Sequence, residues 1–454
     1  MKKTKIVCTI GPSSNNEEML TEMIKAGMDV ARFNFSHGSH ETQKSNLELV
    51  KSVREKLGVP VATMMDTKGP EIRFRDFENG KITLTKGQEF ILSTEEFLGD
   101  TNRGSITYKG LPNDVSVGSM LLVNDGLVQL EITDISSTEI KTKVIVPGDI
   151  SDHKGINAPG ADLKMPFISE QDKSDILFGI EQDYDYIALS FVRTAKDVEA
   201  VRAIIDFNNS KMKIISKIES TQGVENLDEI LKASDGLMVA RGDMGVELPP
   251  EQVPYIQKKM IAKANAAGKI TICATQMLES MTHNPRPTRA EVGDVANAVY
   301  DGVTAVMLSG ESAAGEFPLE TVKMMAKIVE ESEKHLHNEY MAVDDNQRSI
   351  VGKAACDLAD KIKVEKIVVY TDTGRSPAVV SQIKPKTPII VMTRNDKVYY
   401  QSALLYGVEP VRIPGIIEDE NLEAKTTEYM KQKGIKSAIL LFGHAIDSIK
   451  VLHV

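Results

Sequence analysis

The segment DGLMVARGDMG, residues 235–245, combines two patterns that decide the fold. Its first six residues form a short, mostly apolar run, which is typical of a buried parallel strand. Arg241, Gly242 and Asp243 follow directly after that run. A strand with polar residues just beyond its carboxyl end is one repeat of an alternating βα architecture. The same pattern recurs along the chain.

Seven further apolar runs alternate with stretches of helical periodicity such as NNEEMLTEMIKAG (15–27). The runs are KIVCTI (5–10), DVARFNF (29–35), VATMMD (61–66), DYIALSF (185–191), KIISKI (213–218), KITICAT (269–275) and TAVMLS (304–309). Eight βα repeats predict a TIM (β/α)8 barrel of the α/β class. Reactive groups in such a barrel lie at the carboxyl ends of the strands.

Residues 69–165, between the third and fourth runs, are too many for a βα loop. They contain short strand-like segments separated by Gly, Asn-Asp and Pro, which predicts an inserted all-β domain. The segments are KITLTK (81–86), EFILST (89–94), GSITY (104–108), SMLLVND (119–125), VQLEITDI (128–135) and EIKTKVIV (139–146). An insert that leaves the top of a barrel is expected to cover the active site as a lid.

After a helix that is expected to begin near residue 319, four more apolar runs predict a C-terminal open α/β domain. They are KIVVYT (366–371), PIIVMT (388–393), VEPVRI (408–413) and SAILLF (437–442). The predicted domains are therefore the barrel (1–68 and 166–338), the lid (69–165) and the C-terminal domain (339–454).

The composition narrows the classes of function. The chain has 454 residues and a formal net charge of −11 at pH 7, which argues against a nucleic-acid binder that relies on neutralising phosphates. No apolar run reaches the roughly 18 residues of a membrane span, and the amino terminus shows no cleavable signal. Three cysteines far apart offer no disulfide frame or thiolate metal site. A cytoplasmic protein is expected.

Charged and polar side chains follow the predicted barrel strands, so they are expected to meet at one rim. They are Gly11, Pro12, Arg32, Asn34, Ser36, Asp66, Thr67, Lys217, Glu219, Arg241, Gly242, Asp243, Thr275, Ser309 and Glu311. Single residues have simpler explanations: Lys217 and Glu219 could form a structural ion pair, and Arg32 could bridge strands. Asp66 could belong to a turn, and His37 is more typical of packing or hydrogen bonding. Both signs of charge at one rim favour a reactive site.

The residue types at this rim suit an anionic substrate handled with metal ions. Glu219 and Asp243 are hard oxygen ligands appropriate to Mg²⁺ or Mn²⁺. Arg32, Arg73 and Lys217 could neutralise phosphoryl oxygens. An all-oxygen set with one formal charge suits a monovalent cation; it comprises Asn34, Ser36, Asp66 and the carbonyl of Thr67. The residues alone predict a metal-assisted barrel enzyme that acts on a phosphorylated substrate beneath a lid.

Seven motifs, in this order, give the chain a close resemblance to the pyruvate kinase family. They are TIGPSS (9–14), ARFNFSHG (31–38), DTKGPEIR (66–73), KIES (217–220), ARGDMG (240–245), ATQMLESM (274–281) and MLSGES (307–312). The resemblance is closer over the barrel and insert than over the C-terminal domain. It is to bacterial members without an additional C-terminal domain, so none is expected beyond Val454.

The resemblance implies phosphoryl transfer from phosphoenolpyruvate to ADP, giving pyruvate and ATP at the end of glycolysis. It implies that Arg32 contacts the phosphoryl group and that Lys217 stabilises the charge on it in flight. The family further implies that Glu219 and Asp243 bind Mg²⁺ (or Mn²⁺) and that Gly242 and Thr275 bind the substrate carboxylate. It implies a K⁺ site formed by Asn34, Ser36, Asp66 and Thr67. The residues implied to contact the nucleotide are Arg73, Lys154, Pro12 and His37. A water near Thr275 and Ser309 is the expected proton donor.

The resemblance also bears on regulation. In this family an acidic residue at the position of Glu71 accompanies K⁺ dependence, so activation by K⁺ is expected. YTDTGRS (370–376) resembles the sugar-phosphate loop of regulated members, which implies a phosphorylated effector in the C-terminal domain; an ordinary capped loop is the alternative. Asp372 and the short loop LFGHAIDS (441–448) predict weak or absent activation by fructose 1,6-bisphosphate. A homotetramer is expected from the family.

Three positions depart mildly from the family pattern, namely Asn124, Ala158 and Ser312, and they concern lid closure more than chemistry. Two other functions stay open at this point. Another barrel enzyme of phosphoenolpyruvate or pyruvate, such as a lyase or mutase, would explain Arg32, Glu219 and Asp243 but not the lid or the oxygen set. A metabolite sensor without turnover would be signalled by loss of Lys217 or of either carboxylate, and all three are present.

Overall fold

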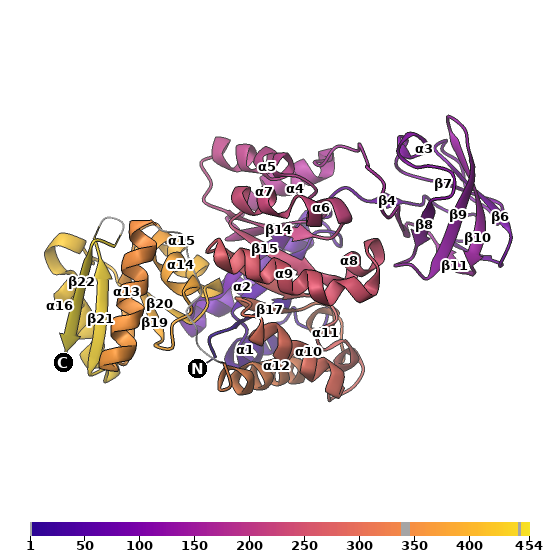
Figure 1. The fold of residues 1–454 in the computed structure, drawn as a ribbon. Coiled ribbons are helices and arrows are strands. Elements are labelled where there is room, and N and C mark those ends of the chain that lie inside the picture. The colour runs from indigo at the N-terminus through magenta and orange to yellow at the C-terminus, as the bar shows by residue number, and fades with distance from the viewer. Residues whose placement is uncertain (1, 337–345, 444–445) are drawn as a thin grey trace.

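A closed barrel of eight parallel strands forms the centre of the molecule (Figure 1). The computed structural model describes residues 2–336, 346–443 and 446–454. The barrel strands are β1 (Lys5–Thr9), β2 (Val30–Asn34), β3 (Ala62–Asp66), β13 (Tyr186–Leu189), β14 (Lys213–Ile218), β15 (Gly236–Ala240), β16 (Ile270–Ala274) and β17 (Ala305–Leu308). They pair in the order β1-β17-β16-β15-β14-β13-β3-β2, so the predicted TIM barrel is confirmed.

Helices pack around the outside of the barrel and bury their apolar faces against it. They are α1 (Glu17–Ala26), α2 (His40–Leu57), α4 (Glu170–Glu181), α5 (Ala195–Phe207), α7 (Leu227–Ala233), α9 (Val253–Ala266), α10 (Arg289–Tyr300) and α12 (Pro318–Glu333). Local sequence fixes where they begin: Ser169 and Thr288, for example, each form a capping box with the acidic residue three positions later. The helix expected near residue 319 begins at Pro318.

Short helices follow the barrel strands at the carboxyl rim. They are α6 (Thr221–Glu225) after β14, α8 (Arg241–Glu247) after β15, η2 (Glu279–Thr282) after β16 and α11 (Gly310–Ala313) after β17; η1 (Pro250–Gln252) leads from α8 into α9. These turns of helix hold the loops that carry the polar rim residues, so the predicted site is built on ordered backbone.

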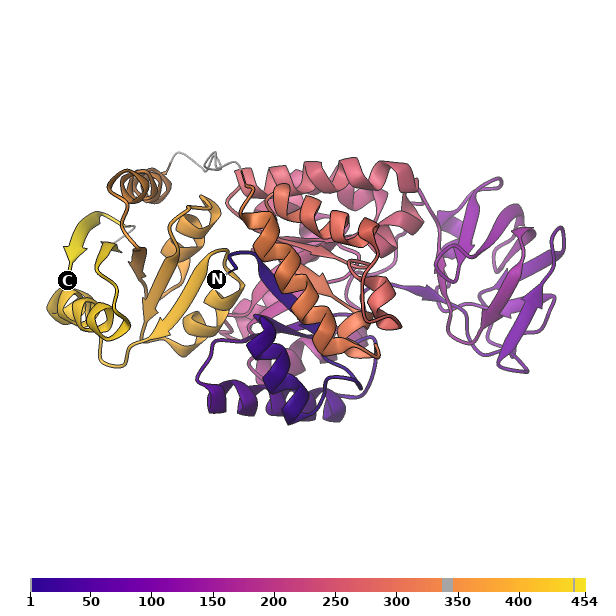
Figure 2. The same cartoon turned by 90° about the horizontal axis from the view of Figure 1, so that it is seen from below.

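An all-β domain is inserted between β3 and α4, as predicted, and it has a hydrophobic core of its own. Its elements are β4 (Ile72–Arg73), β5 (Lys81–Leu84), β6 (Glu89–Ser93), β7 (Arg103–Ser105), α3 (Leu111–Asp114), β8 (Met120–Val123), β9 (Val128–Ile135), β10 (Glu139–Val146), β11 (Gly148–Ser151) and β12 (Gly155–Asn157). They form a seven-stranded sheet and a two-stranded sheet. Figure 2 shows the insert at one end of the molecule, joined to the barrel by two thin segments.

The C-terminal domain is an open five-stranded sheet with helices. Its elements are α13 (Gln347–Ile362), β18 (Lys366–Tyr370), α14 (Arg375–Gln382), β19 (Ile389–Thr393), α15 (Asp396–Gln401), η3 (Ser402–Leu404), β20 (Val408–Arg412), α16 (Glu418–Lys433), β21 (Ser437–Phe442) and β22 (Ser448–His453). The strand order is β20-β19-β18-β21-β22. The four predicted strands are present, and β22, which was not predicted, pairs antiparallel with β21. The predicted boundary at 338/339 and residues 444–445 of the loop LFGHAIDS lie outside the described residues.

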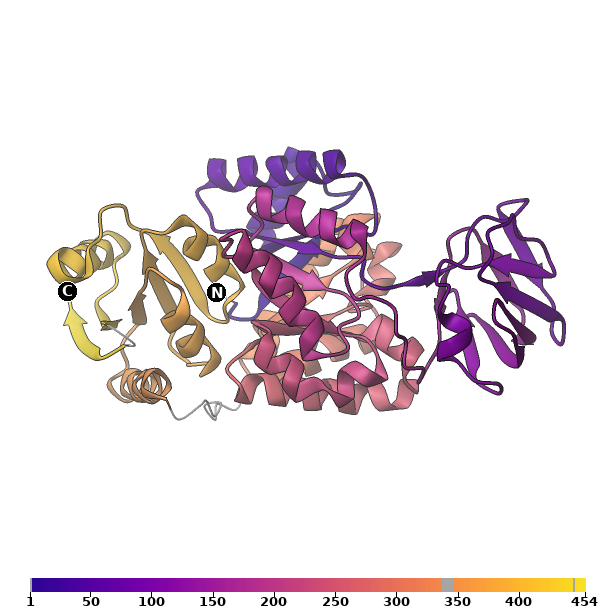
Figure 3. The same ribbon diagram turned by 90° about the horizontal axis from the view of Figure 1, so that it is seen from above.

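The lid and the C-terminal domain lie at opposite ends of the barrel (Figure 3). The lid leaves the carboxyl end of β3, where the polar rim is. The C-terminal domain meets the other end: the Gln401 amide donates to the carbonyl of Asp185 at 3.0 Å and to that of Lys211 at 2.8 Å, just before β13 and β14. The barrel therefore separates the rim from the C-terminal domain.

The three cysteines are buried in the hydrophobic cores. Cys8 lies on β1, Cys273 on β16 and Cys356 on α13. Burial raises the pKa of each thiol above its ordinary value. In the parts of the chain that the structure describes, we find no helix with the length and apolar character of a membrane span.

Candidate active site

Arg32 and Asp66 form a buried ion pair on adjacent strands at the carboxyl rim. The Arg32 Nε donates to Asp66 Oδ2 at 2.6 Å, and its Nη1 donates to the Thr9 hydroxyl at 2.8 Å. Arg32 therefore bridges neighbouring strands, which is the structural role considered for it in the sequence analysis. Burial alone would raise the pKa of Asp66, but Arg32 and Lys217 together hold it below its ordinary value.

Lys217 is the cation at the centre of the rim. Its ammonium lies 2.9 Å from Glu219 Oε1, 3.3 Å from Asp66 Oδ1 and 2.8 Å from the Ser190 hydroxyl oxygen. Lys217 and Glu219 are two residues apart on the chain, so their side chains leave it on the same face. Burial alone would lower the pKa of Lys217, but the carboxylates of Asp66 and Glu219 raise it above its ordinary value. The ammonium therefore stays charged and is held from three sides.

Glu219 is fully buried, and burial raises its pKa to about 8. Its Oε2 accepts from the Phe191 amide at 2.6 Å, and its Oε1 forms an ion pair with the Lys217 ammonium at 2.9 Å. The charge on Asp243 adds to the upward shift, so the two carboxylates act on each other. A buried carboxylate near a second carboxylate fits a hard cation.

No group of three or more His, Cys, Asp or Glu side chains with the arrangement of a metal site occurs among the residues that the structure describes. The site predicted from the sequence has only two carboxylate ligands, Glu219 and Asp243, and the other coordination positions of the divalent ion would be filled by substrate oxygens and water.

Thr275 and Gly242 meet where the loops after β15 and β16 approach each other. The Gly242 amide donates to the Thr275 hydroxyl at 2.8 Å. Thr275 has a φ of 69°, in the left-handed region that non-glycine residues seldom adopt. The Arg241 guanidinium stabilises this conformation, because it donates to the Thr275 carbonyl at 2.6 Å and pairs with Asp294 at 2.6 Å.

The four residues of the expected K⁺ set lie at the carboxyl ends of β2 and β3. Asn34 and Asp66 are direct neighbours in the strand register. The Ser36 amide donates to Asn34 Oδ1 at 3.0 Å, and the Thr67 carbonyl accepts from the Ser190 hydroxyl at 2.6 Å. These four residues thus lie near one another on the rim, at the ends of the two strands that carry the Arg32–Asp66 pair.

A cavity of about 240 Å³ separates the lid from the barrel rim. Arg73 and Lys154 of the lid line it together with Asp243 of the barrel, so the structure brings two expected nucleotide-binding residues to an expected metal ligand. The Asn157 amide of β12 donates to Glu247 Oε1 of α8 at 2.9 Å across this junction. Arg73 pairs with Glu71 at 2.5 Å.

Pro12 and His37 are exposed and do not line this cavity or the neighbouring one of about 620 Å³ that includes Ser36 and Arg73. The structure thus does not bring them to the other expected nucleotide-binding residues. Conversely, Ser190 and Asp294 were not predicted. Ser190 ends the apolar run DYIALSF, and the rule of polar residues after strands, which was applied to the other seven strands, would have found it.

The fold and this rim are those of a TIM-barrel enzyme whose carboxyl rim gathers buried groups of both charges beside an inserted β domain. Comparison with known proteins gives the family. The family model for the pyruvate kinase barrel domain matches residues 1–322, and that for the pyruvate kinase alpha/beta domain matches residues 349–441. The chain belongs to the pyruvate kinase family.

Curated pyruvate kinases agree with this assignment. The protein from Staphylococcus haemolyticus is 46% identical over 448 residues, which cover 97% of this chain and 75% of that protein. The one from Bacillus licheniformis is 48% identical over 417 residues (90% and 71%), and the one from Clostridium perfringens is 47% identical over 418 residues (90% and 88%). The predicted family and enzyme class are confirmed, which favours the kinase over the lyase, mutase and sensor alternatives. The family is metal-dependent.

Proposed function

We propose that this chain transfers the phosphoryl group of phosphoenolpyruvate to ADP, giving pyruvate and ATP. The observation that carries the proposal is the position of the Lys217 ammonium, which lies between Glu219 Oε1 and the Ser190 hydroxyl at the buried rim. A fixed cation at this point stabilises negative charge that develops on a phosphoryl group in flight.

Arg32 and Lys217 act on the phosphoryl group and on the enolate that its departure leaves. Arg32 is fixed by Asp66, so its guanidinium is oriented before the substrate arrives. Glu219 and Asp243 would hold Mg²⁺ or Mn²⁺, which neutralises charge on substrate oxygens when bound. The burial of Glu219 and the effect of the Asp243 charge on it support this role.

Gly242 and Thr275 bind the substrate carboxylate in this proposal. The Gly242 amide and the Thr275 hydroxyl now bond to each other at 2.8 Å, and a carboxylate would accept from both in place of that bond. Thr275 also lies beside the water expected to donate a proton to the enolate, with Ser309 on the next strand.

The lid supplies the nucleotide site and excludes water. Arg73 and Lys154 would contact the phosphates of ADP in the cavity between lid and barrel. Pro12 and His37 would lie near the nucleotide only after the lid has moved toward the barrel. Closure keeps water from intercepting the phosphoryl group.

K⁺ would bind at the corner formed by Asn34, Ser36, Asp66 and the Thr67 carbonyl, and it would activate the enzyme. The oxygens carry one formal charge among them, which suits a monovalent ion. We also propose the domain boundaries given above, a cytoplasmic location and a homotetramer. A phosphorylated effector would bind the C-terminal domain, and fructose 1,6-bisphosphate would activate the enzyme weakly or not at all.

The direct experiment measures pyruvate formed from phosphoenolpyruvate and ADP with Mg²⁺, with and without K⁺. ADP-dependent pyruvate in amounts equal to ATP is expected, together with activation by K⁺. Folded protein that forms no pyruvate under either condition would contradict the proposal. A large fall in the half-saturating phosphoenolpyruvate concentration on adding fructose 1,6-bisphosphate would contradict its regulatory part.

A further inference from the structure

The loop of residues 190–193, after β13, contacts both connections of the lid: the segment that leaves β3, and the return segment, residues 158–169, which leads back to α4. The Ser190 hydroxyl donates to the Thr67 carbonyl at 2.6 Å, and a Cβ on Gly69 would come within 2.8 Å of the Ser190 carbonyl oxygen. This approach is too close for a side chain, so it requires glycine. The start of the lid is therefore fixed to the loop.

Arg193 holds the return segment to the same loop. Its Nη1 donates to the Leu163 carbonyl at 2.6 Å, and its Nη2 donates to the Met165 carbonyl at 2.9 Å. The rigid fork of a guanidinium can bond two carbonyls at once, whereas the compact ammonium of a lysine does not have this geometry. Between the two carbonyls, the Lys164 amide donates to Asp114 Oδ2 of the lid at 2.9 Å. The return segment therefore connects Arg193 of the barrel with the body of the lid.

The loop also positions two charged groups of the candidate active site. The Ser190 hydroxyl oxygen lies 2.8 Å from the Lys217 ammonium, and the Phe191 amide donates to Glu219 Oε2 at 2.6 Å. Phe191 has a φ of 55°, in the left-handed region that bulky residues rarely adopt. Such strain persists only where the surrounding contacts hold it, and it is concentrated at functional sites. A shift of this loop would therefore move both Lys217 and Glu219.

A cavity of about 310 Å³ lies beside the return segment, and Leu163, Phe191 and Arg193 line it. Phe191 also lines the cavity of about 240 Å³ between the lid and the rim. The return segment thus runs next to open space. A segment in this position can pivot at little cost, so its position depends on the bonds that hold it. The two bonds from Arg193 tie it to the loop that contacts Lys217 and Glu219.

We propose that Arg193 is a positioning residue that fixes the angle between the lid and the barrel through its two bonds to the return segment. The inference rests on the proposed function, in which ADP binds between the lid and the rim. At the angle that these bonds hold, Arg73 and Lys154 of the lid line one cavity with Asp243 of the rim. Without the bonds the lid stays attached but swings more freely, so the nucleotide phosphates meet the rim less often in the orientation that transfer needs.

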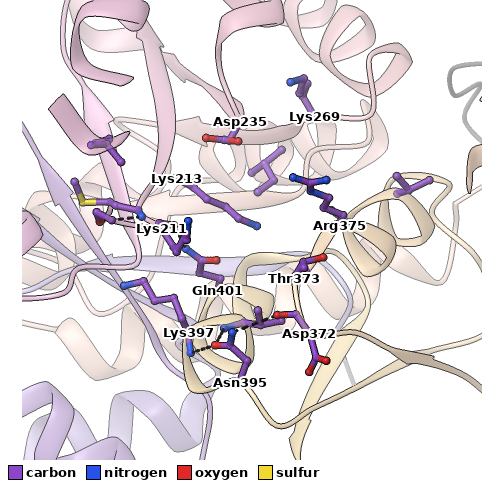
Figure 4. A pocket seen from close by; sticks show the side chains of 18 of the residues that line it. Lys211, Lys213, Asp235, Lys269, Asp372, Thr373, Arg375, Asn395, Lys397 and Gln401 are labelled. Atoms are coloured by element: carbon purple, nitrogen blue, oxygen red, sulfur yellow. Dashed lines mark hydrogen bonds between the residues drawn. The ribbon is translucent and has the colours of Figure 1, made fainter. Parts of the chain in front are cut away.

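The lid junction is separate from the cavity at the other end of the barrel. That cavity, of about 610 Å³, lies between the barrel and the C-terminal domain (Figure 4). Lys213 at the start of β14 lines it, together with Arg375 of the loop expected to bind a phosphorylated effector. Neither Arg193 nor Leu163 lines it. The role of Arg193 can therefore be tested without an effector.

Steady-state kinetics separate this role from a purely structural one. Arg193→Met is expected to raise the KM for ADP by about fivefold to twentyfold, the effect of two charge-assisted hydrogen bonds, and to change the KM for phosphoenolpyruvate by less than about twofold. Arg193→Lys can still bond one carbonyl, so it should recover part of the loss. Lys196→Met, which removes an exposed charge of α5 near the loop, is the matched control and should behave like the wild type. Equal rises in both KM values for Arg193→Met would overturn the proposal.

Hydrogen–deuterium exchange of the chain without ligands tests the same bonds without turnover. Amides of the return segment, including that of Lys164, are expected to exchange about fivefold or more faster in Arg193→Met than in the wild type, with a smaller change in Arg193→Lys. Unchanged exchange within β14 shows that the barrel is folded. Wild-type exchange in the return segment of both variants would overturn the proposal. Faster exchange in an enzyme that forms no pyruvate would support the role of Arg193 in holding the lid and contradict only the proposed function.

Discussion

The hydroxyl oxygen of Ser190 lies 2.8 Å from the Lys217 ammonium, and the same hydroxyl donates to the Thr67 carbonyl at 2.6 Å. Ser190 thus joins the residue proposed to stabilise the transferred phosphoryl group to a carbonyl of the proposed K⁺ corner. It touches neither substrate in the proposed mechanism, so it acts as a positioning residue for Lys217.

Replacing Ser190 by Ala is expected to lower kcat by about tenfold to a hundredfold, because a charged donor loses a fixed acceptor. The KM for phosphoenolpyruvate should change by less than about threefold, since the ion pair between Arg32 and Asp66 Oδ2 remains and only the longer contact of Ser190 with Asp66 Oδ1, at 3.3 Å, is lost. Steady-state kinetics measure both values. Ser216→Ala is the control, because this buried hydroxyl bonds to Ser234 and not to the site. A change in KM alone would show that Ser190 serves ground-state binding instead.

The hydrogen bond from Asn157 to Glu247 connects the lid to the helix that carries Asp243. Asn157→Ala is expected to raise the KM for ADP by about threefold to tenfold, the effect of one hydrogen bond, and to leave the KM for phosphoenolpyruvate within about twofold. Asn102→Ala, in the exposed turn before β7, provides the comparison. Equal changes in both variants would mean that the contact has no part in holding the lid.

Lys384 predicts a dependence of stability on pH. Burial lowers its pKa to about 7, and its ammonium lies 3.2 Å from Asn265 Oδ1, with no carboxylate partner among the residues that the structure describes. Between pH 7 and 10 the unfolded chain binds a proton that the folded chain has lost, so the free energy of unfolding rises with pH by up to about 1.4 kcal/mol per unit. Below pH 7 Lys384 is protonated in both the folded and the unfolded chain, so it no longer makes the free energy of unfolding depend on pH.

Lys384→Met removes this rise. Urea unfolding at pH 7, 8 and 9 should therefore show the stability of Lys384→Met, relative to the wild type, falling as the pH increases. The exposed neighbour Lys386→Met is expected to parallel the wild type. A constant difference between Lys384→Met and the wild type across this range would mean that Lys384 keeps an ordinary pKa in the fold.

Glu71 allows a test of the monovalent cation. The wild type is expected to require K⁺, and Glu71→Lys is expected to be active without it, because an ammonium replaces the charge of the ion. Both Glu71→Lys and Glu71→Gln remove the ion pair of Glu71 with Arg73, but only Glu71→Lys adds an ammonium. Glu71→Gln is therefore the control. Rates are compared in K⁺, Na⁺ and tetramethylammonium buffers. Full wild-type activity without K⁺ and Na⁺ would contradict this prediction.

The barrel could be predicted because each strand is a short, mostly apolar run whose side chains are nearly all buried, and helices separate the runs. The antiparallel strand β22 was missed for the opposite reason: it lies at a sheet edge, and most of its side chains are partly or fully exposed. Residues 441–448 were interpreted as the last loop, and no strand was expected after them.

The candidate site followed from the same rule, since residues after parallel strands must gather at one end of a barrel. The same rule could not predict which side chains from distant parts of the chain form ion pairs with each other. Arg241 and Asp294 are 53 positions apart, and nothing in the local sequence indicates that they meet. The cavity between the barrel and the C-terminal domain is likewise formed by surfaces that only the packing of two domains brings together.

The burial of Cys8, Cys273 and Cys356 has a practical consequence, because the chain also has no tryptophan. Thiol reagents should leave the folded protein unlabelled, and indole fluorescence is absent. A cysteine introduced at the lid edge would thus be the one accessible thiol for a dye, and a tryptophan there would be the one indole in the molecule. Movement of the lid over the rim can then be followed in real time without first removing native residues.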